Sequence, residues 1–307
     1  MDRQATQILE ALAQRAPERP KDADDARWLA DFRYQTALLH DCGGPPQPLH
    51  AISHLMLADG PEPLAVRLYR PAAGRLPLLL HMHGGGAIAG SVDGHDPCLR
   101  ALAHRTGWIV AAPLYRRAPE HRFPAQLDDG WRALLGVAGR ADELGVDAAR
   151  IVVSGDSIGG TFATALAVRS RDQGGPALAG QLLLYPNTDL RRGAAYPSRQ
   201  SEDGNIIALD DLERQIDLHL ACEADRSLPA ASPLLMPDLH GLPRTLLVTC
   251  GADPLRDEGE AYGERLEEAG VDLRHHRFEG MIHGFLQMGG HIGTSTHLLD
   301  LIATWLG

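Results

Sequence analysis

Two spacings of hydrophobic residues alternate along most of this chain. From about residue 65, short apolar runs are separated by longer stretches in which apolar residues recur three or four positions apart. Several of the short runs are nearly continuous, as expected for strands that are buried on both faces of a sheet. The short runs predict strands at residues 65–69, 76–81, 108–112, 150–154, 181–185, 245–249 and 273–278.

The longer stretches predict helices between most of these strands. They lie at residues 97–105, 126–140, 159–171, 258–269 and 297–306. Because strands and helices alternate, the pattern predicts an α/β fold with a mostly parallel, doubly wound central sheet flanked by helices. A chain of 307 residues is long enough for one large domain of this kind with additions.

Two segments depart from this alternation. Residues before Pro48 show only helical spacing, in two stretches whose apolar stripes we expect to pack against the body of the protein. Between about residues 187 and 229 the chain has no strand pattern, only a polar turn region and a helix expected at 209–221. The position of this second segment, after a central strand, suggests the hypothesis that both segments together form a lid.

Composition and charge narrow the functional classes. The net charge of −11 argues against a nucleic-acid partner or an anionic membrane surface. The four cysteines, Cys42, Cys98, Cys222 and Cys250, are far apart and contain no C-x-x-C pair, which indicates free thiols in a reducing compartment. The chain shows neither a signal-peptide pattern nor an apolar run near the about 20 residues of a membrane span, so we expect a cytoplasmic protein.

A strand-to-helix junction carries the first candidate for chemistry. Gly155-Asp156-Ser157-Ile158-Gly159 follows the apolar run 151–153 and precedes an Ala-rich helical stretch. A G-x-S-x-G sequence in this context predicts a nucleophile elbow, a tight turn that exposes the serine hydroxyl at the top of a sheet. The motif alone is equally compatible with a Gly/Ser loop that connects a strand to a helix, so the other groups of the site decide between the two.

Donors for a developing oxyanion are predicted next to another strand. His83-Gly84-Gly85-Gly86 follows the strand at 76–81, and glycines there leave backbone N–H groups accessible to an open site. A phosphate-binding loop would require a Lys-Ser/Thr ending or G-x-G-x-x-G spacing, and neither is present. His81 and His83 lack a second cluster of ligands beyond the stretch Asp93 to Asp96, so we expect no metal.

The base and the acid are predicted from loops late in the chain. His283 lies on a Gly-flanked loop between the last strand and the final helix, whereas His275 and His276 lie within a strand. Asp253 follows the strand at 245–249, and strand ends carry catalytic groups in open α/β sheets. The order Ser157, Asp253, His283 is the order of the triad in α/β hydrolases. Asp257 and Glu258 remain alternatives whose usual role would be to cap a helix.

Taken together, these segments resemble the hormone-sensitive-lipase-like branch of the α/β-hydrolase superfamily, the bacterial family IV esterases. The similarity covers essentially residues 50 to 307 and lies in the order and spacing of several motifs. They are His83-Gly84-Gly85-Gly86, the Tyr115 to Ala125 segment, Gly155 to Gly160, Tyr185-Pro186, Ser232-Pro233-Leu234, Asp253 to Gly259 and His283-Gly284-Phe285.

The resemblance implies an α/β-hydrolase fold and a set of site residues. The implied triad is Ser157, Asp253 and His283, and the implied oxyanion hole is formed by Gly84, Gly85 and Ile158, with His83, Gly86 and Asp156 belonging to the same motifs. It also implies a helical cap, with the chain divided into N-terminal cap helices (1–50), a catalytic domain (51–186 and 231–307) and a cap insertion (187–230).

The implied activity is hydrolysis of short- to medium-chain acyl esters through an acyl-enzyme, without a cofactor and frequently in a homodimer formed along the sheet edge. An amidase, deacetylase or lactonase using the same triad remains an alternative, because the triad does not distinguish the leaving group. A non-catalytic receptor on this fold is a further alternative, although such descendants typically lose the base and both His283 and Asp253 are present. Ile158 and Ala87 depart from the usual pattern, which affects the shape of the substrate site.

Overall fold

The computed structural model describes residues 1–16 and 24–307. Within these residues, eight strands form one sheet in the order β1-β2-β4-β3-β5-β6-β7-β8. β2 runs antiparallel to both of its neighbours, and every other neighbouring pair is parallel. The strands are β1 (Ala51–Leu57), β2 (Leu64–Arg70), β3 (Leu76–Met82), β4 (Ile109–Pro113), β5 (Val146–Asp156), β6 (Gly180–Leu184), β7 (Thr245–Ala252) and β8 (Leu273–Ile282).

All seven strands expected from the sequence are confirmed, and the mostly parallel α/β sheet is confirmed with them. The sequence pattern missed β1, the edge strand, which buries only Leu55 and Leu57 among its seven residues. A strand with so little buried surface has no apolar run to mark it.

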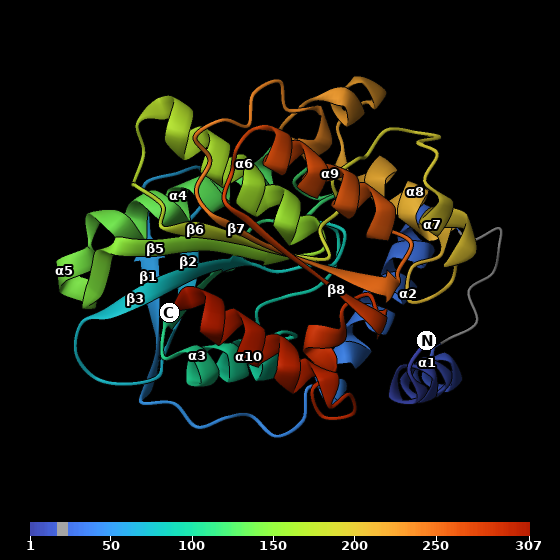
Figure 1. Ribbon diagram of the computed structural model, residues 1–307, viewed down its shortest axis with the longest axis horizontal. Helices are drawn as coiled ribbons and strands as arrows, with labels where there is room; N and C mark the ends of the chain where they lie inside the picture. Colours follow the sequence, from blue (N-terminus) through green and yellow to red (C-terminus); the bar gives the residue numbers. More distant parts are fainter. Residues whose placement is uncertain (17–23) are drawn as a thin grey trace.

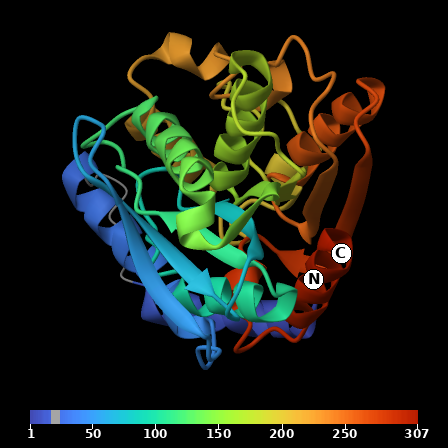
Figure 2. The same cartoon turned by 90° about the vertical axis from the view of Figure 1, so that its left-hand side faces the viewer.

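Helices cover both faces of the sheet. Helices α4 (Ala125–Gly139), α6 (Ile158–Gln173) and α9 (Arg256–Glu268) lie on one face, and α3 (Asp96–Thr106) and α10 (Thr294–Leu306) lie on the other (Figure 1). A view from the side shows the same two layers, with green α4 on one and teal α3 and red α10 on the other (Figure 2). The short α5 (Ala141–Leu144) follows α4.

The two layers explain the continuous apolar runs. In β3, the side chains of Leu78 and Leu80 belong to the core under α4 and α6, whereas Leu79 belongs to the core under α3 and α10. In β5, Val153 likewise belongs to the core under α4 and α6, and Val152 belongs to the core under α3 and α10. Because successive strand residues point to opposite faces, a strand covered on both sides requires apolar residues at every position.

The two segments outside the alternation lie together at one end of the sheet (Figure 1). The N-terminal segment forms α1 (Arg3–Arg15), α2 (Asp25–Ala37) and the 3₁₀ helix η1 (Leu38–Cys42). The second segment contains α7 (Pro197–Ser201), α8 (Leu209–His219) and the 3₁₀ helix η2 (Glu223–Ser227). Two further 3₁₀ helices are η3 (Pro233–Leu235) and η4 (Phe285–Met288). No helix among the described residues is both long and apolar enough to cross a membrane.

Side-chain contacts join the two segments to each other. The indole Nε1 of Trp28 on α2 donates a hydrogen bond to Asp211 Oδ1 on α8 at 3.0 Å. Arg214 on α8 forms an ion pair with Asp25 on α2, with 2.7 Å between Nη2 and Oδ1. We refer to α1, α2, η1 and residues 202–219 together as the cap.

Candidate active site

The turn between β5 and α6 holds Ser157 in a strained backbone conformation. Its φ of 56° and ψ of −127° lie far from the regions that a residue with a Cβ normally occupies. The turn is so tight that a Cβ added to Gly155 would lie 2.0 Å from Gly159 O, and one added to Gly159 would lie 2.0 Å from Met82 O. The two glycines of the motif are therefore required by close backbone approach, as expected for a nucleophile elbow.

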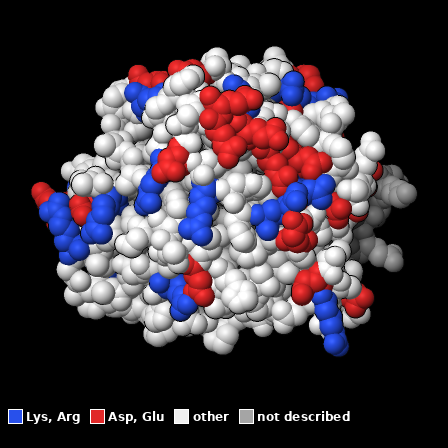
Figure 3. All heavy atoms as spheres, in the orientation of Figure 1, with Lys and Arg blue, Asp and Glu red and all other residues white. Residues whose placement is uncertain are grey.

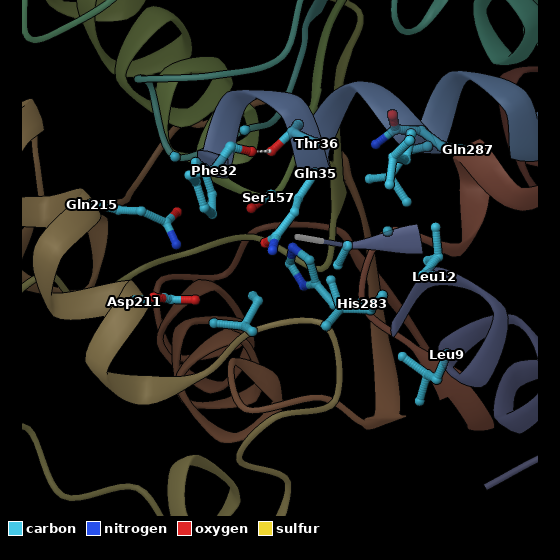
Figure 4. A pocket seen from close by; sticks show the side chains of 18 of the residues that line it. Leu9, Leu12, Phe32, Gln35, Thr36, Ser157, Asp211, Gln215, His283 and Gln287 are labelled. Atoms are coloured by element: carbon cyan, nitrogen blue, oxygen red, sulfur yellow. Dashed lines mark hydrogen bonds between the residues drawn. The ribbon is translucent and has the colours of Figure 1, made fainter. Parts of the chain in front are cut away.

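His283 and Asp253 form a buried hydrogen-bonded pair. His283 Nδ1 lies 2.8 Å from Asp253 Oδ2, and the second carboxylate oxygen, Oδ1, accepts a hydrogen bond from Leu255 N at 2.9 Å. Because a carboxylate only accepts hydrogen bonds, the proton is on Nδ1 and Nε2 is left as a base. The imidazole of His283 and the hydroxyl of Ser157 line the same cavity (Figure 4).

The structure engages the alternative acids elsewhere. Asp257 accepts a hydrogen bond from Ser198 N at 2.7 Å and pairs with Arg256 at 2.8 Å. Glu258 is fully buried and pairs with Arg199, with 2.6 Å between Oε2 and Nη2. Of the three acids considered, Asp253 is the one that contacts His283.

The other late histidines lie away from this pair. His275 and His276 are on β8, where His275 Nε2 lies 2.9 Å from Thr249 Oγ1 and burial lowers the pKa of His275. His291 and His297 are exposed to solvent.

One of the three oxyanion-hole donors expected from the sequence, the backbone N–H of Gly84, is used elsewhere in the structure. The N–H of Gly84 donates to Asp156 Oδ1 at 2.9 Å, so this N–H is already engaged. Gly85 and Gly86 line the cavity instead. In the part of the chain that the structure describes, the N–H groups of Gly85, Gly86 and Ile158 have no protein acceptor. The geometry therefore replaces Gly84 by Gly86 in the candidate oxyanion hole.

Asp156 holds the glycine loop in place through its hydrogen bond from Gly84 N. Its Oδ1 also lies 3.1 Å from His81 Nε2, and its Oδ2 lies 3.4 Å from His95 Nε2. Burial alone would raise the pKa of Asp156, but the neighbouring His95 and His81 hold that pKa well below its usual range. Asp156 is thus a buried anion that fixes the peptide of Gly84, rather than a proton carrier.

His83 performs a similar structural role. Its Nδ1 lies 2.7 Å from Gly84 O, and the hydroxyl of Tyr115 donates to His83 O at 2.8 Å. Burial lowers the pKa of His83 to about 3, so the ring is neutral at ordinary pH. His81 and His95 both turn towards Asp156, and among residues 1–16 and 24–307 no group of three or more His, Cys, Asp or Glu is arranged to hold a metal ion.

The cap encloses a cavity of about 320 Å³ over Ser157 and His283. The apolar lining comes from α1, the residue after it, α2, η1 and the loop before α8, at Leu9, Leu12, Ala13, Ala16, Phe32, Leu38, Leu39, Ile206 and Ile207. The polar lining includes Gln35, Thr36, Asp211, Gln215 and Gln287 (Figure 4). These polar residues have no signature in the sequence, because their spacing matches no motif and only the packing of the cap brings them to the site.

A second set of contacts attaches α2 to Ile88, two residues after the glycine loop, and to Glu120. Arg33 donates from Nε to Ile88 O at 2.8 Å, and its two terminal nitrogens bind the Glu120 carboxylate at 2.8 and 2.7 Å. The hydrogen bonds from Arg33 lower the pKa of Glu120 to about 2, so the carboxylate is ionised at ordinary pH. Arg33 thus connects the cap both to Ile88, which follows the glycine loop, and to Glu120.

Comparisons with known proteins agree with this fold. A family model described as the alpha/beta hydrolase fold matches residues 79–287. Ethyl acetate hydrolase of Pseudomonas putida is 37% identical over 284 residues, which cover 90% of this chain and 87% of that protein. Esterase LipI of Mycobacterium tuberculosis is 36% identical over 265 residues, covering 82% and 81%.

A solved structure is similar over the whole chain. The hyperthermophilic esterase from the archaeon Pyrobaculum calidifontis superimposes with a TM-score of 0.92 at 35% sequence identity, covering 100% of this chain and 97% of that one. The chain therefore belongs to the α/β-hydrolase family. Within that family, the resemblance to the hormone-sensitive-lipase-like branch is confirmed.

Proposed function

We propose that this protein is a serine carboxylesterase in which Ser157, His283 and Asp253 form the catalytic triad. The observation that carries the proposal is the buried contact of 2.8 Å between His283 Nδ1 and Asp253 Oδ2, in the cavity that the strained Ser157 also lines. The relatives named esterase or hydrolase of an ester support the choice of an ester substrate.

The geometry supports an acyl-enzyme mechanism. His283 Nε2 takes the proton of the Ser157 hydroxyl as Oγ attacks the ester carbonyl, and Asp253 stabilises the imidazolium that forms. The oxyanion accepts hydrogen bonds from the backbone N–H groups of Gly85, Gly86 and Ile158. His283 then gives its proton to the departing alcohol, and a water molecule hydrolyses the acyl-enzyme by the same steps in reverse order.

The proposed substrates have short to medium acyl chains. A cavity of about 320 Å³ is at the small end of the range for ligand sites, and its apolar lining suits a few methylene groups. Hydrolysis of p-nitrophenyl esters from acetate to palmitate is the test, and kcat/KM is expected to be highest for short chains. An optimum at palmitate would contradict the size argument.

The alternatives make different predictions in the same assay. A non-catalytic receptor on this fold would hydrolyse no ester and would not be labelled by a fluorophosphonate, which reacts with an activated serine. An amidase or lactonase would be labelled, but would hydrolyse matched anilides or lactones faster than the esters. Turnover of esters together with labelling of Ser157 would support the carboxylesterase.

We propose that the cap acts as a lid that sets the acyl-chain preference. Replacing Arg33 with methionine removes the contacts with Glu120 and Ile88 O, so α2 is expected to be held less firmly over the active site. KM for medium-chain esters is expected to rise about threefold to tenfold, because the Arg33–Glu120 pair is partly exposed and each of its hydrogen bonds is therefore weakened by solvent. Chain-length preference should flatten, while kcat for acetate changes little.

The matched control is Arg27→Met on the same helix, because the ion pair of Arg27 among the described residues is with Asp31, also on α2. This control should leave the chain-length preference unchanged. Equal effects of the two substitutions, or no effect of Arg33→Met, would contradict the lid.

We also propose that two copies of the chain associate along the sheet edge formed by β8. Five of the ten β8 residues are exposed, including Arg274 and His276, and an exposed edge strand offers unpaired backbone groups to a second copy. Light scattering at micromolar concentration should give twice the mass of 33.1 kDa. A monomer under these conditions would contradict the proposal.

We further propose a cytoplasmic location and a small-molecule ester as the binding partner. Four free cysteines support a reducing compartment. The net charge of −11, with acidic side chains gathered over α9 on the face seen in Figure 3, disfavours nucleic acid and anionic membranes as partners.

A further inference from the structure

Gln215 is a buried amide that faces the cavity without a protein partner. It is 8% exposed and lines the cavity from α8. Among the described residues, no side chain or backbone group forms a hydrogen bond with its carboxamide. Burial of an unpaired amide is unfavourable, so such a group in a binding cavity indicates a partner that arrives with the ligand.

The position of Gln215 relative to the reacting atoms is well defined. A Cβ added to Gly86 would lie 2.2 Å from Gln215 Oε1, so the amide lies directly against the glycine loop. Figure 4 places Ser157 between Gln215 on one side and His283 on the other. Gln215 is therefore on the side of the nucleophile opposite the base.

This placement identifies the part of an ester that Gln215 would meet. In the tetrahedral intermediate on Ser157 Oγ, the leaving alcohol must be within reach of His283, and the oxyanion must face the N–H groups of the glycine loop. The acyl chain takes the remaining direction, away from His283. That direction leads to α8.

A second polar group lies on the same face of α8. Asp211 precedes Gln215 by four residues, so their side chains are neighbours on the helix surface. Both side chains point into the cavity (Figure 4). The carboxylate of Asp211 accepts a hydrogen bond from Trp28 Nε1 at 3.0 Å, which fixes its position between α8 and α2.

We propose that Asp211 and Gln215 form a polar wall at the end of the acyl site and that the protein prefers hydroxyacyl esters over unsubstituted acyl esters of the same length. This inference rests on the proposed esterase function. A hydroxyl on the acyl chain donates to Asp211 and exchanges a hydrogen bond with the amide of Gln215. An alkyl chain displaces water from Gln215 and leaves its amide unpaired, and a buried polar group of this kind discriminates strongly against ligands that cannot pair with it.

The test compares ethyl 3-hydroxybutyrate with ethyl butyrate in the wild type and in Gln215→Leu. The ratio of the two kcat/KM values is the measurement, because within one variant it is independent of the fraction of active protein. Dividing the wild-type ratio by the variant ratio also cancels the intrinsic reactivity of the two esters. The ratio is expected to fall about tenfold in Gln215→Leu, the loss of one hydrogen bond to a buried group.

Gln287→Leu is the matched control. Gln287 is also a buried amide of the cavity lining, 7% exposed, but it lies on the His283 side of Ser157 in Figure 4. Its substitution should leave the hydroxyacyl-to-acyl ratio unchanged. A ratio that is unaffected by Gln215→Leu, or that falls equally in both variants, would overturn the polar acyl wall while leaving the esterase intact. Absence of turnover of both esters, together with absence of fluorophosphonate labelling, would instead refute the proposed function and the inference with it.

Discussion

Replacing Ser157 with alanine is expected to lower kcat for ester hydrolysis by about a millionfold, the size of effect seen when a triad serine is removed from other hydrolases. The reason is that no other group at the elbow can form the covalent acyl intermediate. The backbone strain at φ 56° is unchanged by the substitution, because alanine also carries a Cβ. The thermal unfolding midpoint is therefore expected to stay close to that of the wild type.

The interaction between Ser157 and His283 provides a sharper check. If the two residues act as a unit, the double variant Ser157→Ala/His283→Ala should be no slower than either single variant, because each substitution alone already removes the covalent route. Initial rates with p-nitrophenyl acetate at substrate saturation measure this. If the fold-reduction of kcat in the double variant equalled the product of the two single fold-reductions, the two residues would contribute independently, which would contradict the triad.

Local motifs explain why most of the site was predictable from the sequence. The elbow requires Gly155 and Gly159 because backbone atoms approach within 2.0 Å of where a Cβ would be, and this requirement is visible as a sequence pattern. His283 and Asp253 follow the ends of neighbouring parallel strands, β8 and β7, so the order of elements alone brings them to one edge of the sheet.

Features that depend on tertiary contacts were not predictable in the same way. Gly84 was expected to be an oxyanion donor, but its N–H is bound by Asp156, 72 residues later in the chain. The polar wall at Gln215 exists only because α8 packs over the glycine loop, and no spacing in the sequence records that packing. Strand β1 was not predicted because it lies at the edge of the sheet and buries only two side chains, so its sequence contains no apolar run.

A buried ion pair beside the site suggests the second large effect. Arg199 on α7 binds Glu258 on α9, with distances of 2.6 and 3.1 Å from Nη2 and Nε to Oε2. The other oxygen of Glu258 accepts hydrogen bonds from Asn187 Nδ2 at 2.6 Å and Thr188 N at 2.8 Å. These contacts join residues 187 and 188, where the strand-free segment before β7 begins, to α9. Helix α9 begins at Arg256, three residues after Asp253 in the sequence.

Replacing Arg199 with methionine is expected to lower the free energy of unfolding by about 3–5 kcal/mol at pH 8, because Glu258 is left buried without its counter-charge. Burial already raises the pKa of Glu258, and loss of Arg199 removes the charge that opposes this rise. Between the unfolded and folded pKa values the folded state binds more protons, so stability falls as pH rises. The loss measured by urea unfolding should therefore be smaller at pH 5 than at pH 8.

Two further variants separate this electrostatic explanation from a simple packing effect. Arg150→Met removes a half-exposed arginine that pairs with Asp147 and should cost less than about 1 kcal/mol. The double variant Arg199→Met/Glu258→Met replaces both charges by apolar side chains and should recover most of the lost stability, because the uncompensated carboxylate is gone. If the double variant were less stable than Arg199→Met, or if the loss in Arg199→Met did not depend on pH, packing around Arg199 rather than the buried charge of Glu258 would be the cause.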